Sequence, residues 1–441
     1  MGSFLFSPTT RLERLDRPDE SLERLVSRDM DLRDALSRAP GWEQALYRVL
    51  WGDEDPVNDS IGWYEELTGL VDSPLAQLER VILLAEAGQA TRLSAAIIPW
   101  EFRGGDAPRM EKWVRAAYLG TAPGPDEGRR LIEEVRENLP SSWFADVLVA
   151  HIAAGIGDRA TRAEAEAGIA DRGEALLNRR RALAVGEIVL LVLCVVMLKR
   201  YLTSGAEVRV GEAPIPPCWT MHDGYGLFIR GVFGFLFINA LASFALPKET
   251  PFVGVATLAA GTPLLWWATR YLAAKGVSVP AAFGLRSPAG GAARVAGVTV
   301  VLMGLSVMGE AVIALAEGIF NIKTHWADGL MENMIWGSSW LVAGEALDGI
   351  VWAPLVEEIA FRGVLFATLR TRMGVWPAVL ASAAIFAFVH GYSVVGFASV
   401  FWSGILWALA YERTRSLWPG MLAHAANNLL VTGEFIWLVR L

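Results

Sequence analysis

Six side chains in the last quarter of the chain are ionisable or strongly polar, although the sequence around them is apolar. They are Glu357, Glu358, Arg362, His390, His424 and Asn428. An ionised side chain at the centre of a bilayer costs about 2.5–3.5 kcal/mol on insertion scales, so it needs a partner or a function. Together the six supply carboxylates, two imidazoles, a carboxamide and a guanidinium. We therefore treat them as candidate catalytic residues of a hydrolytic site.

Helical spacing predicts which of these side chains share a face. Glu358 and Arg362 are four residues apart, so we expect them to pair and to orient their helix. Glu357 points about 100° around the helix from Glu358, so we expect it to face a cavity away from that arginine. His424 and Asn428 are also four residues apart and should project from one face of the last helix.

Peptide hydrolysis needs a base that activates water and donors that hold the oxyanion. A carboxylate on one helix and an imidazole on the next can position a water, which predicts this role for Glu357 and His390. A His and an Asn on one face can both donate to the tetrahedral oxygen, which predicts that role for His424 and Asn428.

A metal-bound water is the alternative. Glu357, His390 and His424 would make a zinc set with an open position, although the chain has no His-Glu-x-x-His motif. Asn428 is not a usual zinc ligand, and with His424 it resembles a pair of donors. We therefore favour a reaction that requires no cofactor, and zinc stays open.

Each motif also has a purely structural interpretation. Glu358 with Arg362 would tie helices together, His390 would be an interfacial residue, and His424 would be one of two polar side chains that join helices. The three motifs fall on three helices of one bundle, and this combination favours a functional site.

The elements that position the site are expected to be apolar helices. The chain of 441 residues is 53% hydrophobic with 18 Trp and a mean hydropathy of +0.36, and a span needs about 20 residues. Spans are expected near 182–198, 225–246, 252–272, 294–316, 344–369, 376–390, 394–411 and 419–438. The predicted fold class is therefore all-α: a polytopic membrane bundle of about eight spans over residues 182–441, preceded by a soluble helical domain.

That first domain, residues 1–181, is rich in Arg, Glu and Asp and carries no motif with chemistry. We expect a regulatory or adaptor domain whose partner is unknown. Its expected helices are Ser21–Leu36, Gly41–Trp51, Pro74–Ala87, Ala107–Leu119, Asp126–Asn138, Trp143–Gly155 and Ala160–Leu177. The net charge of −8 makes nucleic acid an unlikely partner, and the two cysteines build neither a disulfide framework nor a Cys-based metal site.

Basic residues give two opposing predictions of topology. Arginines at 370, 372, 413 and 415 place their loops in the cytoplasm, and eight spans then put residues 1–181 outside. The lack of a signal peptide and the Arg179–Arg181 cluster favour a cytoplasmic domain instead, so the side stays open.

The ordered motifs E-E-x-x-x-R, F-x-x-x-H and H-x-x-x-N resemble the signature of the CPBP (CAAX protease and bacteriocin-processing, or Abi) family. Its eukaryotic relatives are the Ras-converting prenyl-protein endopeptidases, and the similarity covers about residues 344–430. The resemblance implies a helical intramembrane bundle with a water-accessible cavity open to the cytoplasm. The family is usually described as metalloproteases, whereas the Ras-converting type has been described as glutamate-dependent. The long N-terminal domain lies outside the family core.

We therefore expect an intramembrane endopeptidase that cuts a membrane-associated or CAAX-like peptide. Its expected partners are the lipid bilayer and a peptide or protein substrate. The expected location is a cell membrane that the chain crosses several times, specifically a bacterial inner membrane. The alternatives are a non-proteolytic immunity or scaffold protein of the same family and a proton-coupled transporter, for which the chain shows no inverted repeat.

Overall fold

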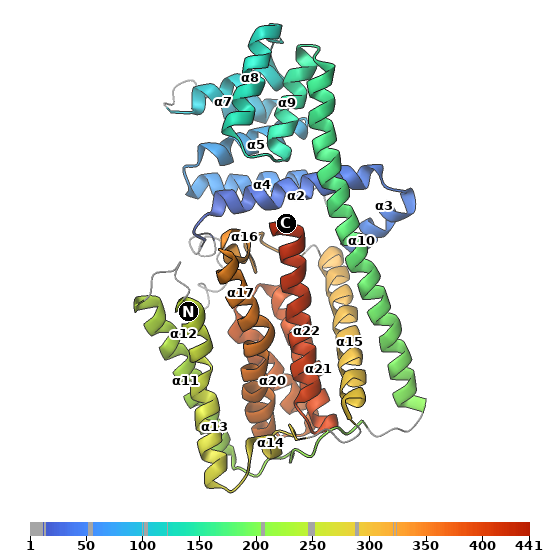
Figure 1. Ribbon diagram of the computed structural model, residues 1–441, viewed down its shortest axis with the longest axis vertical. Helices are drawn as coiled ribbons and strands as arrows, with labels where there is room; N and C mark the ends of the chain where they lie inside the picture. The colour runs from blue at the N-terminus through green and yellow to red at the C-terminus, as the bar shows by residue number, and fades with distance from the viewer. Residues whose placement is uncertain are drawn as a thin grey trace. The chain divides into compact units, whose positions relative to one another are not determined.

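The computed structural model describes residues 12, 15–51, 56–98, 100, 105–120, 122–203, 208–245, 252–286, 291–320, 322 and 324–441. These residues form helices joined by loops and contain no β-strand, which confirms the all-α fold class (Figure 1). They divide into two compact units. We call them the N-terminal unit, mainly Ser7–Ala182, and the membrane unit, mainly Leu183–Ile436.

The helices of the N-terminal unit are short and packed as neighbouring pairs. They are α2 (Pro18–Arg38), α3 (Gly41–Trp51), α4 (Pro56–Leu70), α5 (Pro74–Glu86), α6 (Ala90–Ile97), α7 (Ala107–Val114), η2 (Arg115–Leu119), α8 (Pro125–Asn138), α9 (Trp143–Gly155) and the first part of α10 (Arg159–Thr203). All seven expected helices are present, and α4 and α6 are additional.

The prediction that Ala160–Leu177 and the span 182–198 are separate helices is wrong. Both belong to α10, which continues for 45 residues. The intervening Arg179–Arg181 cluster contains good helix formers and no Gly or Pro that would end the helix. Arg181 also forms an ion pair with Glu43 at 2.7 Å, so one charge of this cluster is already used inside the N-terminal unit.

Buried aromatic and aliphatic side chains form the core of the N-terminal unit, and an ion triad fastens α10 to it. Trp113 and Tyr64 have no exposed surface. Arg172 of α10 lies 2.9 Å from Asp31 of α2 and 2.7 Å from Asp146 of α9. One planar guanidinium thereby joins three helices.

The carboxyl group of Glu79 on α5 is buried in the same core with 1% of the residue exposed. No hydrogen bond reaches its Oε2 atom from any described residue, and no cationic side chain of the described part pairs with it. Burial raises the pKa of Glu79 well above its usual range, and the nearby carboxylate of Glu23 adds to this effect. The carboxyl group is therefore stabilised in its protonated form.

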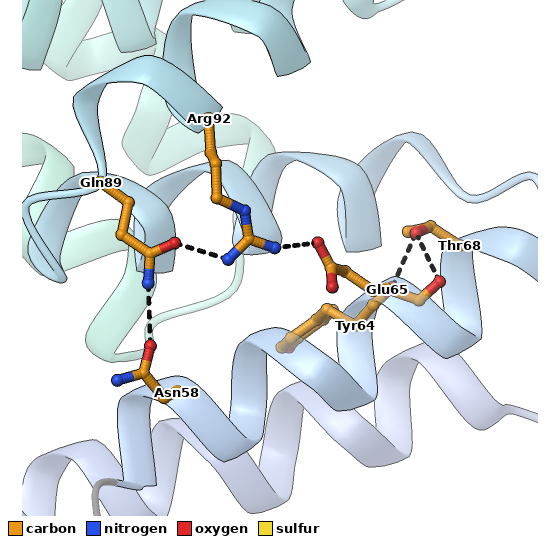
Figure 2. Close-up of polar contacts among 6 residues, drawn as sticks. All are labelled: Asn58, Tyr64, Glu65, Thr68, Gln89 and Arg92. Carbon is orange, nitrogen blue, oxygen red and sulfur yellow. Dashed lines mark hydrogen bonds and ion pairs between the residues drawn. The ribbon is translucent and has the colours of Figure 1, made fainter.

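A polar network on the surface joins α4 to the start of α6, as Figure 2 shows. Gln89 donates to Asn58 at 2.8 Å, and Arg92 contacts both Gln89 and Glu65. The side chains of Arg92 and Glu65 are 49% and 44% exposed. Exposed ion pairs of this kind contribute about 0–1 kcal/mol, so this network adds little stability.

The membrane unit contains the remainder of the helices. They are the second part of α10, α11 (Met221–Ala245), α12 (Phe252–Ala260), α13 (Thr262–Ala274), α14 (Val279–Ala282), α15 (Gly291–Phe320), α16 (Glu332–Trp336), α17 (Ser339–Leu347), η3 (Asp348–Trp352), α18 (Ala353–Glu357), η4 (Glu358–Phe366), α19 (Ala367–Leu369), α20 (Val375–His390), α21 (Val394–Thr414) and α22 (Trp418–Phe435). The last segment, η5 (Ile436–Arg440), is divided between the two units. Within this unit α20 packs along α21, and α15 packs against α21 and α22 (Figure 1).

Four helices of the described chain, α10, α11, α15 and α21, are long and apolar enough to cross a membrane. The other four expected spans also coincide with helical segments, but each is shorter or interrupted. The segment 252–274 breaks at Gly261, and α20 has only 16 residues. The last two are the helix that carries Glu357 and α22, both of which contain polar residues.

Helical backbone runs from α17 to α19, and two π-helical segments interrupt its regular winding. The segments are η3 and η4, which lie on either side of the short α18. Pro354 cannot donate a backbone hydrogen bond and would clash with a carbonyl of a regular preceding turn, which accounts for the wide turn η3 just before it. Such π-segments occur often at functional sites. Here α18 ends at Glu357 and η4 begins at Glu358.

Candidate active site

Glu358 and Arg362 form the predicted ion pair inside the membrane unit. Arg362 Nη1 lies 2.9 Å from Glu358 Oε1, and the two side chains are 1% and 0% exposed. The guanidinium carbon of Arg362 also lies over two aromatic rings, 4.1 Å from the centroid of Phe386 and 4.9 Å from that of Trp407. Both ring faces attract a desolvated cation. The partners of this arginine thus come from its own segment η4 and from the helices α20 and α21.

His424 on α22 connects the two neighbouring carboxylates. Its Nδ1 atom lies 3.3 Å from Glu358 Oε1, and its Nε2 atom lies 3.7 Å from Glu357 Oε2. The imidazole stacks on Trp407 with ring centroids 4.1 Å apart and planes at 22°. The ring is thus held between two carboxylates and an aromatic face, which fixes its orientation.

Glu357 and Glu358 differ in exposure, as their positions around the helix predict. The side chain of Glu357 is 30% exposed, whereas that of Glu358 is fully buried. The distance of 3.7 Å from Glu357 Oε2 to His424 Nε2 exceeds a hydrogen bond. Of the two carboxylates, Glu357 is therefore the one that a solvent molecule can reach.

His390 lies at the end of α20, where Gly391 adopts a left-handed conformation (φ 67°) that ends the helix. Its Nδ1 atom is 2.7 Å from the carbonyl oxygen of Phe386. A carbonyl only accepts hydrogen bonds, so Nδ1 carries the proton and Nε2 is left as an acceptor. The Phe386 ring contacts both His390 and His424, with centroids 4.7 and 6.0 Å away. The described contacts join His390 to the cluster through this ring and not directly to Glu357.

Asn428 lies one helical turn after His424, and its amide nitrogen donates to the carbonyl oxygen of Gly349 in η3 at 2.7 Å. A carboxamide has two N–H groups, so this bond fixes its orientation and leaves the second N–H for another acceptor. The contacts of Asn428 thus tie α22 to the helix that carries Glu357, but no contact in the described residues joins it to His424.

Trp407 on α21 was not among the expected site residues, yet it contacts both Arg362 and His424. A tryptophan in the middle of an apolar helix, away from the ends where interfacial tryptophans gather, was the available signal. Gly420 ends the Ser416-Leu-Trp-Pro-Gly run before His424, which resembles the family's lead-in to its last motif, but it was given no role from the sequence. A Cβ atom at this position would lie 2.9 Å from Glu358 Oε2, so α22 can approach the ion pair this closely only with glycine there.

The arrangement of the side chains does not fit a zinc ion. The described residues contain no group of three His, Cys, Asp or Glu side chains gathered closely enough to hold a metal. Both nitrogens of His424 face carboxylates, and Nδ1 of His390 is engaged by a backbone carbonyl. We therefore derive no catalytic step through a metal from the expected set of Glu357, His390 and His424.

Comparison with known proteins identifies the segment that carries these residues. Residues 339–430 match the family described as Rce1-like, type II CAAX prenyl endopeptidase, which confirms the resemblance expected from the motifs. A Bacillus subtilis (strain 168) protein named "Putative membrane peptidase YdiL" is 32% identical over 85 residues. The aligned part is 18% of this chain and 32% of that protein, so the chain spans less than half the length of this relative. No solved structure matches.

Proposed function

We propose that the membrane unit is an intramembrane endopeptidase that hydrolyses a peptide bond of a membrane-associated or CAAX-like substrate. The observation that supports this most is the cluster in which His424 lies between the partly exposed Glu357 and the buried Glu358. The cluster falls within the segment that matches a family of endopeptidases.

In the proposed reaction Glu357 acts as the general base. It accepts a proton from a water molecule while the water oxygen attacks the carbonyl carbon of the scissile bond. The Nε2 atom of His390 is an available acceptor, and we assign it the second hydrogen of the same water. The proton held by Glu357 then passes to the leaving nitrogen as the C–N bond breaks.

His424 and Asn428 are the proposed donors to the tetrahedral oxyanion. With Nδ1 of His424 next to Glu358, its Nε2 atom faces the side of Glu357, and an Nε2–H group there would donate to the substrate oxygen as negative charge develops. Asn428 would supply its second amide N–H. The Glu358–Arg362 pair holds the partner of His424 in place, so we give it a positioning role.

We extend the proposal to topology and domain roles. The eight apolar helical segments would each cross a cell membrane, specifically a bacterial inner membrane, with the bilayer and a peptide substrate as partners. Residues 1–181 would form a soluble regulatory or adaptor domain.

The decisive experiment compares carboxylates of the membrane unit in purified full-length protein. Glu357→Gln should lower cleavage of a membrane-anchored peptide by about 10²- to 10⁴-fold, the usual contribution of a general base, and His424→Ala should also abolish measurable turnover. Glu310→Gln is the matched control, because Glu310 on α15 is bonded to Ser399 at 2.7 Å and belongs to no proposed step.

If Glu357→Gln and His424→Ala leave cleavage unchanged in folded protein, the proposed catalytic site is wrong. If the folded wild-type protein cleaves no membrane-anchored peptide, an immunity or scaffold protein becomes the better description. Metal analysis of the same preparation tests the cofactor-free mechanism. We expect activity to survive a chelator, whereas stoichiometric zinc that is lost with His390→Ala would contradict that mechanism.

A further inference from the structure

A second cleft lies in the membrane unit, lined by residues that take no part in the proposed reaction. Its volume is about 870 Å³, within the range of small-molecule sites, and the segment after α10 forms one wall while α20 and α21 form the other. Its charged lining residues are Arg209, Glu212, Glu412, Arg413 and Arg415.

The charge balance of the cleft favours an anion. Glu412 is 9% exposed and is held by Arg370 at 3.1 and 3.2 Å, and Arg415 lies 3.7 Å from it. Its negative charge is therefore matched inside the protein. The other carboxylate of the lining, Glu212, is exposed to solvent and forms no ion pair with any residue that the structure describes.

Two arginines of the lining remain available to a ligand. Arg413 is exposed and makes no hydrogen bond or ion pair with any residue that the structure describes. Arg209 is also exposed, and its one described side-chain bond runs from Nε to the carbonyl oxygen of Gly211 at 3.3 Å. The two terminal nitrogens of Arg209 therefore make no hydrogen bond with any described residue. A planar guanidinium group can donate two parallel hydrogen bonds to two oxygens of one phosphate.

The cleft lies where apolar helices end. Glu412 and Arg413 belong to the last turn of α21, one of the four helices able to cross a membrane. Trp376, in the first turn of α20, lines the cleft and is 60% exposed. Tryptophan is enriched at the level of lipid headgroups, and apolar Val208, Val375 and Leu409 complete the wall.

We propose that this cleft binds the phosphate headgroup of an anionic phospholipid. Arg209 and Arg413 would contact the phosphate, while Trp376 and the apolar wall would contact the glycerol and the start of the acyl chains. Basic pockets between membrane helices are known to bind the headgroups of acidic lipids. Here the arginines would supply the charge, and the tryptophan and the apolar wall would contact the rest of the lipid. A soluble phosphate would use the arginines but gain nothing from the apolar wall.

The test measures lipid binding to the full-length protein in neutral detergent by native mass spectrometry, with phosphatidylglycerol and phosphatidylcholine titrated separately. We expect phosphatidylglycerol to bind more tightly. Arg209→Gln with Arg413→Gln should weaken it about 25-fold, or about fivefold for each charge, which corresponds to about 1 kcal/mol per arginine. The control is Arg286→Gln with Arg372→Gln, which removes the same charge from exposed positions that do not line the cleft.

Three outcomes would overturn the proposal. One is equal weakening by the control pair, which would show a diffuse charge effect. Another is unchanged binding in the Arg209 and Arg413 variant. The third is complete displacement of the lipid from the wild-type protein by excess inorganic phosphate, which would identify a site for free phosphate instead.

Discussion

Two buried carboxyl groups, Glu79 in the N-terminal unit and Glu358 in the membrane unit, have opposite surroundings. Glu79 in the N-terminal unit is 1% exposed and lies beside Tyr64 and another acid, Glu23. Glu358 in the membrane unit is fully buried but has Arg362 at 2.9 Å and His424 at 3.3 Å. A buried pair is weak evidence for stability, because desolvation offsets most of the attraction. Glu358 thus keeps a cationic partner, whereas Glu79, beside a second acid, is stabilised in its protonated form.

The largest effect should follow from breaking the membrane pair. Arg362→Met leaves Glu358 buried without its cation, which destabilises a protein by about 3–5 kcal/mol. We expect loss of peptide cleavage together with a lower melting temperature of the purified protein in detergent.

The double variant Glu358→Met with Arg362→Met tests whether the ion pair serves stability or cleavage. Removing both charges should recover much of the stability, because apolar side chains of similar volume can replace a buried pair, while peptide cleavage stays lost. If cleavage returns along with stability, the pair is structural and the comparison fails.

A smaller effect is expected where aromatic stacking positions His424. Trp407→Phe keeps an aromatic ring but reduces the surface that lies 4.1 Å from the imidazole. Aromatic pairs contribute about 0.5–1.5 kcal/mol beyond burial, so cleavage should fall by up to about tenfold. A shifted pH profile of cleavage would indicate that His424 is affected, and a loss of stability with an unchanged profile would argue against this role for Trp407.

In the N-terminal unit, Glu79→Gln should stabilise the fold at neutral and basic pH. The folded-state pKa of Glu79 is raised above the unfolded value near 4.5. Its contribution to stability is therefore fully present below that value and is lost as pH rises through the folded-state pKa. Gln cannot ionise, so hydrogen exchange in α5 should be slower than in wild type at pH 8 and similar at pH 4. If wild type and Glu79→Gln exchange at equal rates at both pH 4 and pH 8, ionised Glu79 does not destabilise the fold.

The smallest change is expected on the surface of the same unit. Arg92→Ala removes the exposed contacts to Glu65 and Gln89 drawn in Figure 2. We expect less than about 1 kcal/mol of destabilisation, and less still in high salt, because solvent and ions screen this pair. Thermal unfolding at two salt concentrations measures it, and a loss as large as that of Arg362→Met would remove the distinction between buried and exposed pairs.

The local parts of this architecture follow from sequence spacing, and the non-local parts do not. A separation of four residues predicts the Glu358–Arg362 pair, and apolar spacing predicts most of the helices. The helix α6 has only eight residues, about two turns over which a spacing can recur, and α4 mixes apolar residues with Asn, Asp and Gly. Trp407 reaches His424 only because α21 packs against α22, and no spacing within one helix specifies that contact.

The π-helical winding of 358–366 has a consequence for how this protein can vary. A π-turn contains one more residue than a regular turn, so the wide winding depends on the number of residues in this stretch. Deleting one residue would return the stretch to regular winding and change which of its side chains share a face with Glu357. Natural variants should therefore keep the number of residues between Glu358 and Phe366, and insertions and deletions should be confined to the loops outside this stretch.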